Sequence, residues 1–112
     1  MGIVLRSPGY VYFVAAENGL VKIGCTTNAL KRLRKIVAST PVKTRVKLVI
    51  ETNDATSLEK MFHDKFSDKR VKGEWFSLSE SDVGFIYKWM EENGAYPDDE
   101  DFNNQVEMLN VV

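Results

Sequence analysis

The sequence predicts a single small domain of the α/β (α+β) class, and three observations support this prediction. First, β-branched and aromatic side chains at residues 10–14 are followed by Asn18-Gly19 and a second apolar run at residues 20–24, which is typical of a β-hairpin. Second, residues 44–52 alternate between apolar and polar side chains, as in a strand with one buried face. Third, apolar side chains at helical spacing follow these strand segments. A chain of 112 residues is long enough for one modest core.

The hairpin and the first helix are predicted from local signals. Asn18 and Gly19 both tolerate positive φ, so they favour a tight turn between the two strands. Gly24 ends the second strand, and Thr26, Thr27 or Asn28 can cap the helix that follows. The helix ends near Ser39, before the boundary at Thr40-Pro41. Its apolar side is formed by Leu30, Leu33, Ile36 and Val37.

The middle of the chain is predicted to form a third strand and a second helix. Residues 44–52 bury Val46, Leu48 and Ile50, although Val49 interrupts the strict alternation. Asn53-Asp54 forms a turn and a helix cap, and residues 56–66 form the helix. The apolar stripe of this helix consists of Leu58, Met61, Phe62 and Phe66.

A charged loop is predicted at residues 67–73, a short strand or extended segment at 74–78, and a helix that starts within residues 79–82 and ends at Asn93-Gly94. Residues 1–94 therefore form the domain, and residues 95–112 form an acidic C-terminal tail that can be helical. A tail helix would place Phe102, Val106 and Leu109 on one face. The tail is either a solvated terminus, or a segment that docks on a partner or folds back on the basic body, and the sequence favours neither.

The composition of the chain indicates the cellular compartment in which we expect the protein. No apolar run approaches the roughly 20 residues of a membrane span, and the N-terminal MGIVLRSPGY has too short an apolar core for a secretory signal. The single cysteine, Cys25, excludes an intrachain disulfide. We therefore expect a cytoplasmic protein, or a nucleoid or nuclear one if it binds DNA, and no membrane partner.

The charge distribution indicates an anionic partner. Residues 1–73 carry 14 Lys and Arg against 6 Asp and Glu, a net charge of +8, whereas residues 74–112 carry 1 basic and 10 acidic residues, a net charge of −9. The two parts either neutralise each other within the fold or leave a basic surface for nucleic acid, and clustering of the basic residues favours the second alternative. Candidate DNA-binding residues are Lys31, Arg34, Lys35, Lys69, Arg70 and Lys72, with Trp75 as core or as a stacking surface.

Five residues are candidates for chemistry. Tyr12 and Lys22 lie on neighbouring strands of the hairpin, and Arg32 lies on the helix just after it, so a phosphate can be bound there. Taken singly, a core tyrosine, an exposed lysine and a solvated arginine are the simpler interpretations. Glu59 and His63 are four residues apart on one helical face and can bind one cation, and Mg²⁺ suits such a sparse ligand set because it keeps several waters.

Alternatives exist for these two helix residues. A single histidine is more often a capping or partly buried residue, and Glu59 can simply pair with a neighbouring Lys60, Lys65 or His63. Cysteine catalysis by Cys25 is disfavoured, because the chain has no second histidine to activate it.

In their order along the chain, these residues resemble the GIY-YIG nuclease superfamily, and are most similar to its compact phage and fungal branch of the meiotically up-regulated gene type. The resemblance spans residues 9–90 and rests on five ordered blocks. The blocks are Gly9-Tyr10-Val11-Tyr12, Val21-Lys22-Ile23-Gly24-Cys25-Thr26, Arg32-Leu33, Glu59 with His63, and Gly73-Glu74-Trp75-Phe76.

The resemblance implies a three-stranded antiparallel sheet flanked by helices, and metal-dependent cleavage of a phosphodiester in DNA. By the match, Tyr12 is the tyrosine of the first motif, Arg32 contacts the scissile phosphate, and Glu59 binds a single Mg²⁺ or Mn²⁺ ion. Lys22 stands where the classical superfamily has its second tyrosine, as is usual in this branch, and would hold phosphate or assist Tyr12.

Two further classical positions differ. Ile36 replaces the helix histidine, and the late asparagine has no counterpart, so His63 or Glu74 would substitute for it. The function predicted from the sequence is thus a DNA endonuclease or nicking enzyme. A non-catalytic nucleic-acid-binding or regulatory protein is the alternative. The tail would allow a homodimer or a protein partner.

Overall fold

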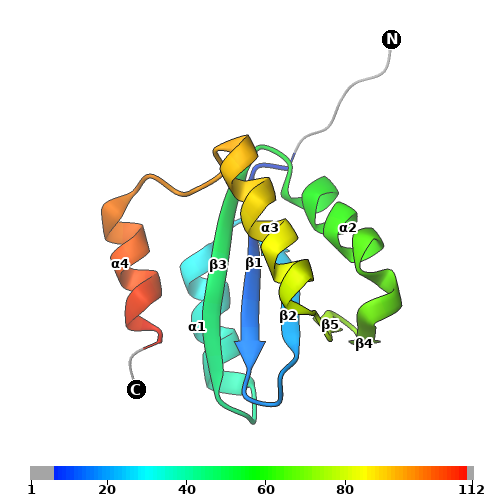
Figure 1. Cartoon of the computed structure of the whole chain (residues 1–112). Coiled ribbons are helices and arrows are strands. Elements are labelled where there is room, and N and C mark those ends of the chain that lie inside the picture. Colours follow the sequence, from blue (N-terminus) through cyan, green and yellow to red (C-terminus); the bar gives the residue numbers. More distant parts are fainter. Residues whose placement is uncertain (1–6, 111–112) are drawn as a thin grey trace.

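The computed structural model describes residues 7–110 and confirms the α+β class (Figure 1). An antiparallel sheet with the strand order β3-β1-β2-β5-β4 forms the middle of the molecule. In chain order, the elements are β1 (Gly9–Ala16), β2 (Val21–Thr26), α1 (Ala29–Ser39), β3 (Thr44–Thr52), α2 (Ala55–Lys65), the 3₁₀ turn η1 (Ser67–Lys69), β4 (Arg70–Lys72), β5 (Trp75–Phe76), α3 (Glu80–Asn93) and α4 (Glu100–Met108).

The described sheet has five strands rather than the three implied by the family resemblance. The segment 67–73, predicted as a loop, contains η1 and β4, and β4 pairs with β5 across the turn at Gly73, whose φ is 56°. β5 in turn pairs with β2 through Val21↔Phe76 and Lys22↔Trp75. All three residues of β4 are exposed, so hydrogen bonding to β5, and not an apolar pattern, makes this segment a strand.

The β1–β2 turn forms where predicted, but only one of its two turn residues adopts positive φ. Only Gly19 has positive φ, at 90°, and Asn18 does not adopt it. The N–H of Gly19 donates to the carbonyl of Ala16, and the N–H of Ala16 donates to the carbonyl of Leu20, so the loop has three residues. Three-residue hairpin loops place glycine at their left-handed position, and this explains why Gly19 alone carries the positive φ.

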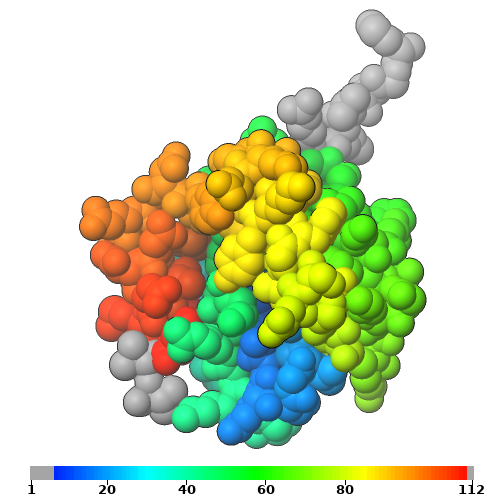
Figure 2. Space-filling view, in the orientation of Figure 1, coloured from blue at the N-terminus to red at the C-terminus, as the bar shows by residue number. Residues whose placement is uncertain are grey.

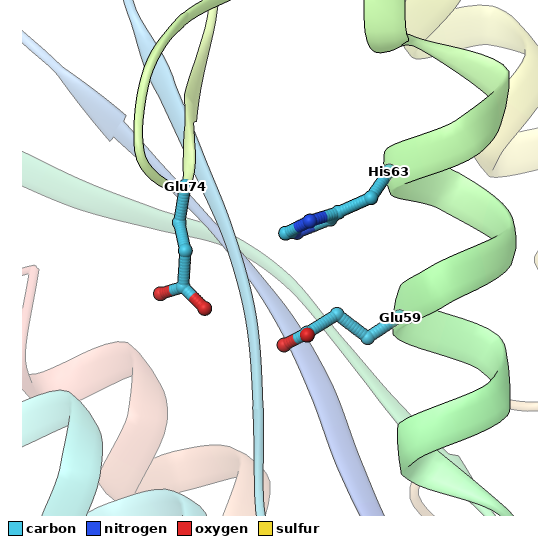
Figure 3. Close-up of side chains that lie close together, drawn as sticks. All are labelled: Glu59, His63 and Glu74. Atoms are coloured by element: carbon cyan, nitrogen blue, oxygen red, sulfur yellow. The ribbon is translucent and has the colours of Figure 1, made fainter.

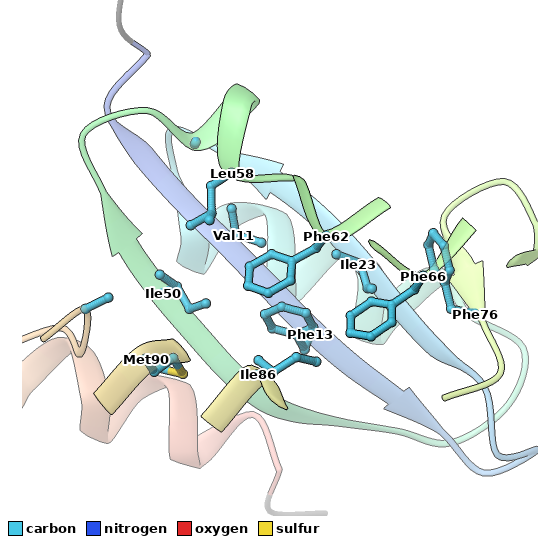
Figure 4. Packing of buried hydrophobic residues seen from close by; sticks show 12 residues of the cluster. Val11, Phe13, Ile23, Ile50, Leu58, Phe62, Phe66, Phe76, Ile86 and Met90 are labelled. Carbon is cyan, nitrogen blue, oxygen red and sulfur yellow. The ribbon is translucent and has the colours of Figure 1, made fainter. Parts of the chain in front are cut away.

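Two helices cover each face of the sheet, which makes three layers (Figure 1). Helices α2 and α3 pack on one face, where Phe62 of α2 meets Phe13 of β1 edge to face, with ring centroids 5.3 Å apart (Figure 4). Helices α1 and α4 pack on the other face, against Tyr12 and Val14 of β1. Side chains of a strand alternate between its faces, so Tyr12 and Phe13 enter different cores.

Strand β3 has the predicted bounds, but both of its faces are buried. Its pairing with β1 shifts by one residue between Phe13↔Leu48 and Val14↔Val46, so Lys47 is the extra residue of a bulge. After the bulge, Val49 faces the α1 side and Leu48 the α3 side. The expectation of one buried face was wrong because the bulge shifts the alternation and because α4 covers the second face.

Helix ends follow the predicted caps. Asn28 caps α1 by accepting from the N–H of Lys31, and Asp54 caps α2 by accepting from the N–H of Ser57. Ser79 and Asp82 form a capping box at the start of α3, which ends at Gly94 with φ 56°. The predicted start and end of each domain helix are therefore correct to within about one residue.

The acidic tail folds back on the domain, which decides between the alternatives that the sequence left open (Figure 2). The ring of Phe102 stacks on Tyr10 with centroids 5.3 Å apart. The side-chain amide of Asn110 donates to the carbonyl of Val46 at 3.1 Å, and its oxygen accepts from the N–H of Val46 at 2.8 Å. The apolar side of α4 thus completes the core on the α1 face.

No helix within residues 7–110 is long and apolar enough to cross a membrane. Most of the N-terminal stretch considered as a secretory signal, residues 1–6, lies outside the described residues. The division of the chain at residue 94 stays a prediction.

Candidate functional site at the edge of strand β2

The candidate site lies where strand β5 stops and leaves one edge of β2 open. The last contact along this edge is the N–H of Ile23, which donates to the carbonyl of Glu74 at 2.9 Å. In the part of the chain that the structure describes, no strand pairs with Gly24–Thr26 on this side. Helix α2 runs beside the gap, and its side chains meet backbone groups that a neighbouring strand would otherwise cover.

Three potential metal ligands meet at this edge (Figure 3). Glu59 and His63 point from α2, and Glu74 points from the turn between β4 and β5. One ligand atom from each of the three lies within 4.8 Å of the other two, and all three residues are partly buried. Two carboxylates and an imidazole are a suitable donor set for Mg²⁺ or Mn²⁺, because these ions favour oxygen ligands and retain water at their other positions.

Both ring nitrogens of His63 are already hydrogen bonded. Nε2 lies 2.8 Å from the carbonyl oxygen of Ile23, and because a carbonyl only accepts, Nε2 carries the hydrogen. Nδ1 then accepts from Nη2 of Arg70 at 3.0 Å. The ring is therefore held in one tautomer and orientation. It can ligate a cation only if one of these two partners is displaced, whereas the carboxylates of Glu59 and Glu74 each have further lone pairs and can ligate while they keep their contacts with Cys25 and Lys22.

Tyr12 reaches the same edge from the other face of the sheet. It is opposite Gly24 in the β1–β2 register, and the residue is only 1% exposed. A Cβ at Gly24 would overlap the hydroxyl and ring of Tyr12, so the phenol lies directly over this glycine. The absence of a side chain at Gly24 is what lets the Tyr12 hydroxyl cross β2 toward the open edge.

Glu59, Glu74 and Arg32 are close enough to the Tyr12 hydroxyl for their charges to act on its pKa. Burial raises the pKa of Tyr12 to about 12, with further raising by the carboxylates of Glu74 and Glu59 and an opposing effect of the Arg32 guanidinium. Cys25 has its pKa raised to about 11, mainly by burial and by its hydrogen bond to Glu59, so its thiol is protonated at neutral pH. The two carboxylates, Arg32, Cys25 and the phenol therefore share one electrostatic environment.

Lys22 links the cluster to an aromatic surface. Its Nζ lies 3.4 Å from Oε1 of Glu74 and 5.3 Å from the ring centroid of Trp75. Lys22 and Trp75 are paired across β2 and β5, so they share the sheet face that carries Gly24. The structure thus brings Tyr12, Lys22, Arg32, Glu59 and His63, all predicted from the sequence, to one strand edge.

The predicted DNA-binding residues divide into two groups. Lys31, Arg34 and Lys35 are exposed on α1, where Arg34 donates to the side-chain oxygen of Gln105 in α4 at 3.1 Å. In the second group, Lys72 is exposed, whereas Lys69 pairs with Asp82 at 2.5 Å and Arg70 contacts both His63 and the Phe76 ring. Trp75 is half-buried. The charges of Lys69 and Arg70 are therefore engaged within the protein.

The helical spacing predicted that Glu59 and His63 can bind one cation, the family resemblance implied Glu59 as the metal ligand, and Glu74 was named only as a substitute for a missing asparagine. The structure places both carboxylates together. The position of Glu74 directly after Gly73 could have indicated its role in the sequence. Gly73 adopts a left-handed turn before β5, and this turn brings Glu74 to the place where the pairing between β5 and β2 ends.

Residues 9–91 match the T5orf172 domain. The chain belongs to the T5orf172 domain family. This family is associated with phage and nuclease-like proteins, which is compatible with a function related to nucleic acids. Comparison with curated proteins and with solved structures gave no match. The T5orf172 match contains every candidate site residue described above and ends before α4, so the site belongs to the family's domain and the tail helix lies outside the matched segment.

Proposed function

We propose that this T5orf172 domain is a divalent-metal-dependent endonuclease or nicking enzyme that hydrolyses phosphodiester bonds in DNA, with a site of the GIY-YIG type. The observation that carries the proposal is the meeting of Glu59, His63 and Glu74 at the open edge of β2, beside the Tyr12 hydroxyl. A buried phenol, two carboxylates and two cationic side chains in one place are the groups that phosphodiester hydrolysis needs.

In this proposal, Glu59 and Glu74 hold one Mg²⁺ or Mn²⁺ ion. The ion supplies charge neutralisation for the phosphate and activation of the attacking water. His63 helps to shape the metal site, because its hydrogen bonds to Ile23 and Arg70 fix the orientation of its ring beside the carboxylates of Glu59 and Glu74.

Tyr12 acts in its protonated form before a metal ion binds, because its pKa of about 12 keeps the hydroxyl intact at neutral pH. The hydroxyl can then donate to a phosphate oxygen or orient the attacking water. Two causes of the raised pKa are the negative charges of Glu74 and Glu59, and neutralising them shifts the phenol toward a proton acceptor, in the direction in which Arg32 already acts.

Lys22 and Arg32 bind the phosphate. Arg32 is exposed on α1, and its guanidinium can make two parallel hydrogen bonds to phosphate oxygens. Lys22 reaches the same region because it pairs with Glu74. On binding, the phosphate would share Lys22 with Glu74 and leave that carboxylate available to the metal ion.

Cleavage of supercoiled plasmid DNA tests this proposal. We expect nicked or linear product with Mg²⁺ or Mn²⁺ and none with EDTA. Glu59→Gln keeps the size of the side chain but removes its charge, and should lower the rate by about 100-fold or more. Glu91→Gln, an exposed glutamate on α3, is the matched control and should cut like the parent. Equal cutting by Glu59→Gln and the parent would refute the proposed site.

A second candidate function is DNA binding without catalysis. It is favoured by the two cationic contacts that the chain already makes in the site, from Lys22 to Glu74 and from Arg70 to His63, because they neutralise the cluster without a metal ion. This function predicts DNA binding that is unaffected by EDTA and by Glu59→Gln. Its affinity should weaken with salt with a slope of about −0.9 per neutralised phosphate. Binding that is insensitive to salt would refute it.

A further inference from the structure

A hollow lies next to the candidate site, on the sheet face that carries Lys22. It has a volume of about 450 Å³ and is formed by the β1–β2 hairpin, the C-terminal end of α1, and strands β4 and β5. Its walls are mostly apolar and include Leu20, Ile36, Val42, Val71 and Trp75. Val71 is 58% exposed and Val42 is 37% exposed, so part of this apolar surface faces solvent.

The strand register explains why the hollow combines an aromatic ring with positive charge. Trp75 is paired with Lys22 of β2 on one side and with Lys72 of β4 on the other. Residues directly opposite each other in paired strands project from the same face, so the three side chains form a row with the indole in the middle. Both lysines also line the hollow.

We propose that this hollow is a nucleobase-binding subsite, in which an unpaired base stacks on Trp75 while its backbone phosphates contact Lys22 and Lys72. This inference rests on the proposed function, because it names the form of DNA that the same site would select. A flat aromatic ligand fits an apolar hollow with an indole wall, and stacking accepts any base because each has a π face. The lysines match the charge of the flanking phosphates.

Lys22 connects the subsite to the cluster of carboxylates. It lines the hollow and its Nζ is 3.4 Å from Glu74, so a nucleotide in the hollow has its phosphate beside the potential metal ligands. A base within a continuous duplex would first have to be flipped out of the stack, which costs unstacking and unpairing energy that an unpaired base does not pay. The preferred substrate is therefore DNA with an unpaired base next to the cleaved bond, such as a bulge, a branch or a single strand.

Binding in EDTA separates this inference from cleavage. The probes are a duplex with one bulged adenosine, the same duplex with an abasic nucleotide at the bulge, and a fully paired duplex. We expect the parent to bind the bulged adenosine most tightly. Trp75→Leu should lower that affinity by about 5- to 150-fold and leave the abasic probe unchanged, whereas Trp75→Phe, which keeps an aromatic ring, should retain most of the preference.

Tryptophan fluorescence gives an independent measurement that does not need a Trp75 substitution. The chain has two tryptophans, so Trp89→Phe leaves Trp75 as the reporter. Its emission should be quenched by the bulged adenosine and not by the abasic probe. Equal affinity of the parent for both bulged probes, or an emission that responds equally to both, would overturn the inference. Base-dependent binding without cleavage in Mg²⁺ would support the subsite and refute the nuclease. Cleavage with no preference for an unpaired base would do the reverse.

Discussion

Gly24→Ala tests the arrangement that brings Tyr12 to the open edge of β2. The φ of Gly24 is not in the left-handed region, so alanine is compatible with the backbone there. The added methyl group, however, would overlap the Tyr12 hydroxyl and Cζ and would lie 2.9 Å from Cε1. Tyr12 is 1% exposed and packs with residues of α1 and β3, so moving its ring would disturb a packed core.

The expected magnitude follows from two opposing effects. Overpacking of a well-packed core costs about 1–3 kcal/mol. Replacing glycine by alanine at a compatible backbone position restricts the unfolded chain and returns about 0.4–1 kcal/mol. We therefore expect Gly24→Ala to lower the free energy of unfolding by about 1.3 kcal/mol, the difference of the two mid-range values, and by about 2.6 kcal/mol at most. Gly84→Ala in α3 is the matched control, because its Cβ would meet open space and helical alanine should stabilise by about 0.5–1 kcal/mol.

Urea unfolding of a double-mutant cycle measures the contact itself. In the Tyr12→Leu background the para-hydroxyl and the ring edge are absent, so Gly24→Ala should become neutral or stabilising there. The expected coupling free energy between the two positions is about 1–3 kcal/mol. If the cost of Gly24→Ala is the same in both backgrounds, Tyr12 does not lie over Gly24 and our account of the site geometry is wrong.

Three other predictions concern ionisation and the tail. Burial raises the pKa of Tyr12 from 10.0 to about 12, so between pH 10 and pH 12 the folded state holds one more proton than the unfolded state. The free energy of unfolding should therefore fall by about 2 kcal/mol as the pH rises from below 10 to 12. Tyr12→Phe should remove this loss, and absorbance of tyrosinate should show one tyrosine fewer titrating near pH 12; a Tyr12→Phe variant with the same high-pH profile would contradict the assignment. Asn110→Ala removes two hydrogen bonds to Val46 and should lower the free energy of unfolding by about 1–2 kcal/mol, whereas the exposed Asn104→Ala should have little effect; equal urea midpoints for the two variants would exclude the bonds. Neutralising the exposed Glu100 and Glu107 to Gln removes acidic charge from α4 and leaves its apolar side on the domain, so DNA affinity measured at low salt should rise, and an unchanged affinity would show that these charges do not compete with DNA.

Local signals predicted most of the fold because they act within a few residues. Asn28, Asp54 and Gly94 each occupy the cap position that their side chain or backbone freedom favours. Strand β4 was missed because its exposed residues have no apolar pattern and become a strand only by pairing with β5. The bulge at Lys47 was also beyond local reasoning, although the irregular Val49 was its visible trace in the sequence.

The candidate site was predictable only where its residues share an element. Glu59 and His63 are four residues apart on one helix, so their common face follows from helical geometry. The position of Glu74 depends on where β5 ends along β2, which is a long-range property of the sheet. The hydrogen bond of His63 to Ile23 likewise joins two segments that are distant in sequence. Arg70 lies beyond the end of α2, so helical spacing does not predict its hydrogen bond to His63.

The two hydrogen bonds between Asn110 and Val46 also bear on how the outer edge of strand β3 is covered. Strand β3 is at the outside of the sheet, and an outer strand offers unpaired backbone groups to the strands of other molecules. The Asn110 amide presents one donor and one acceptor to Val46, as an adjoining strand would, and α4 stands over the same border. The tail therefore closes this border against intermolecular β-pairing, and a chain cut before α4 should form aggregates joined through β3.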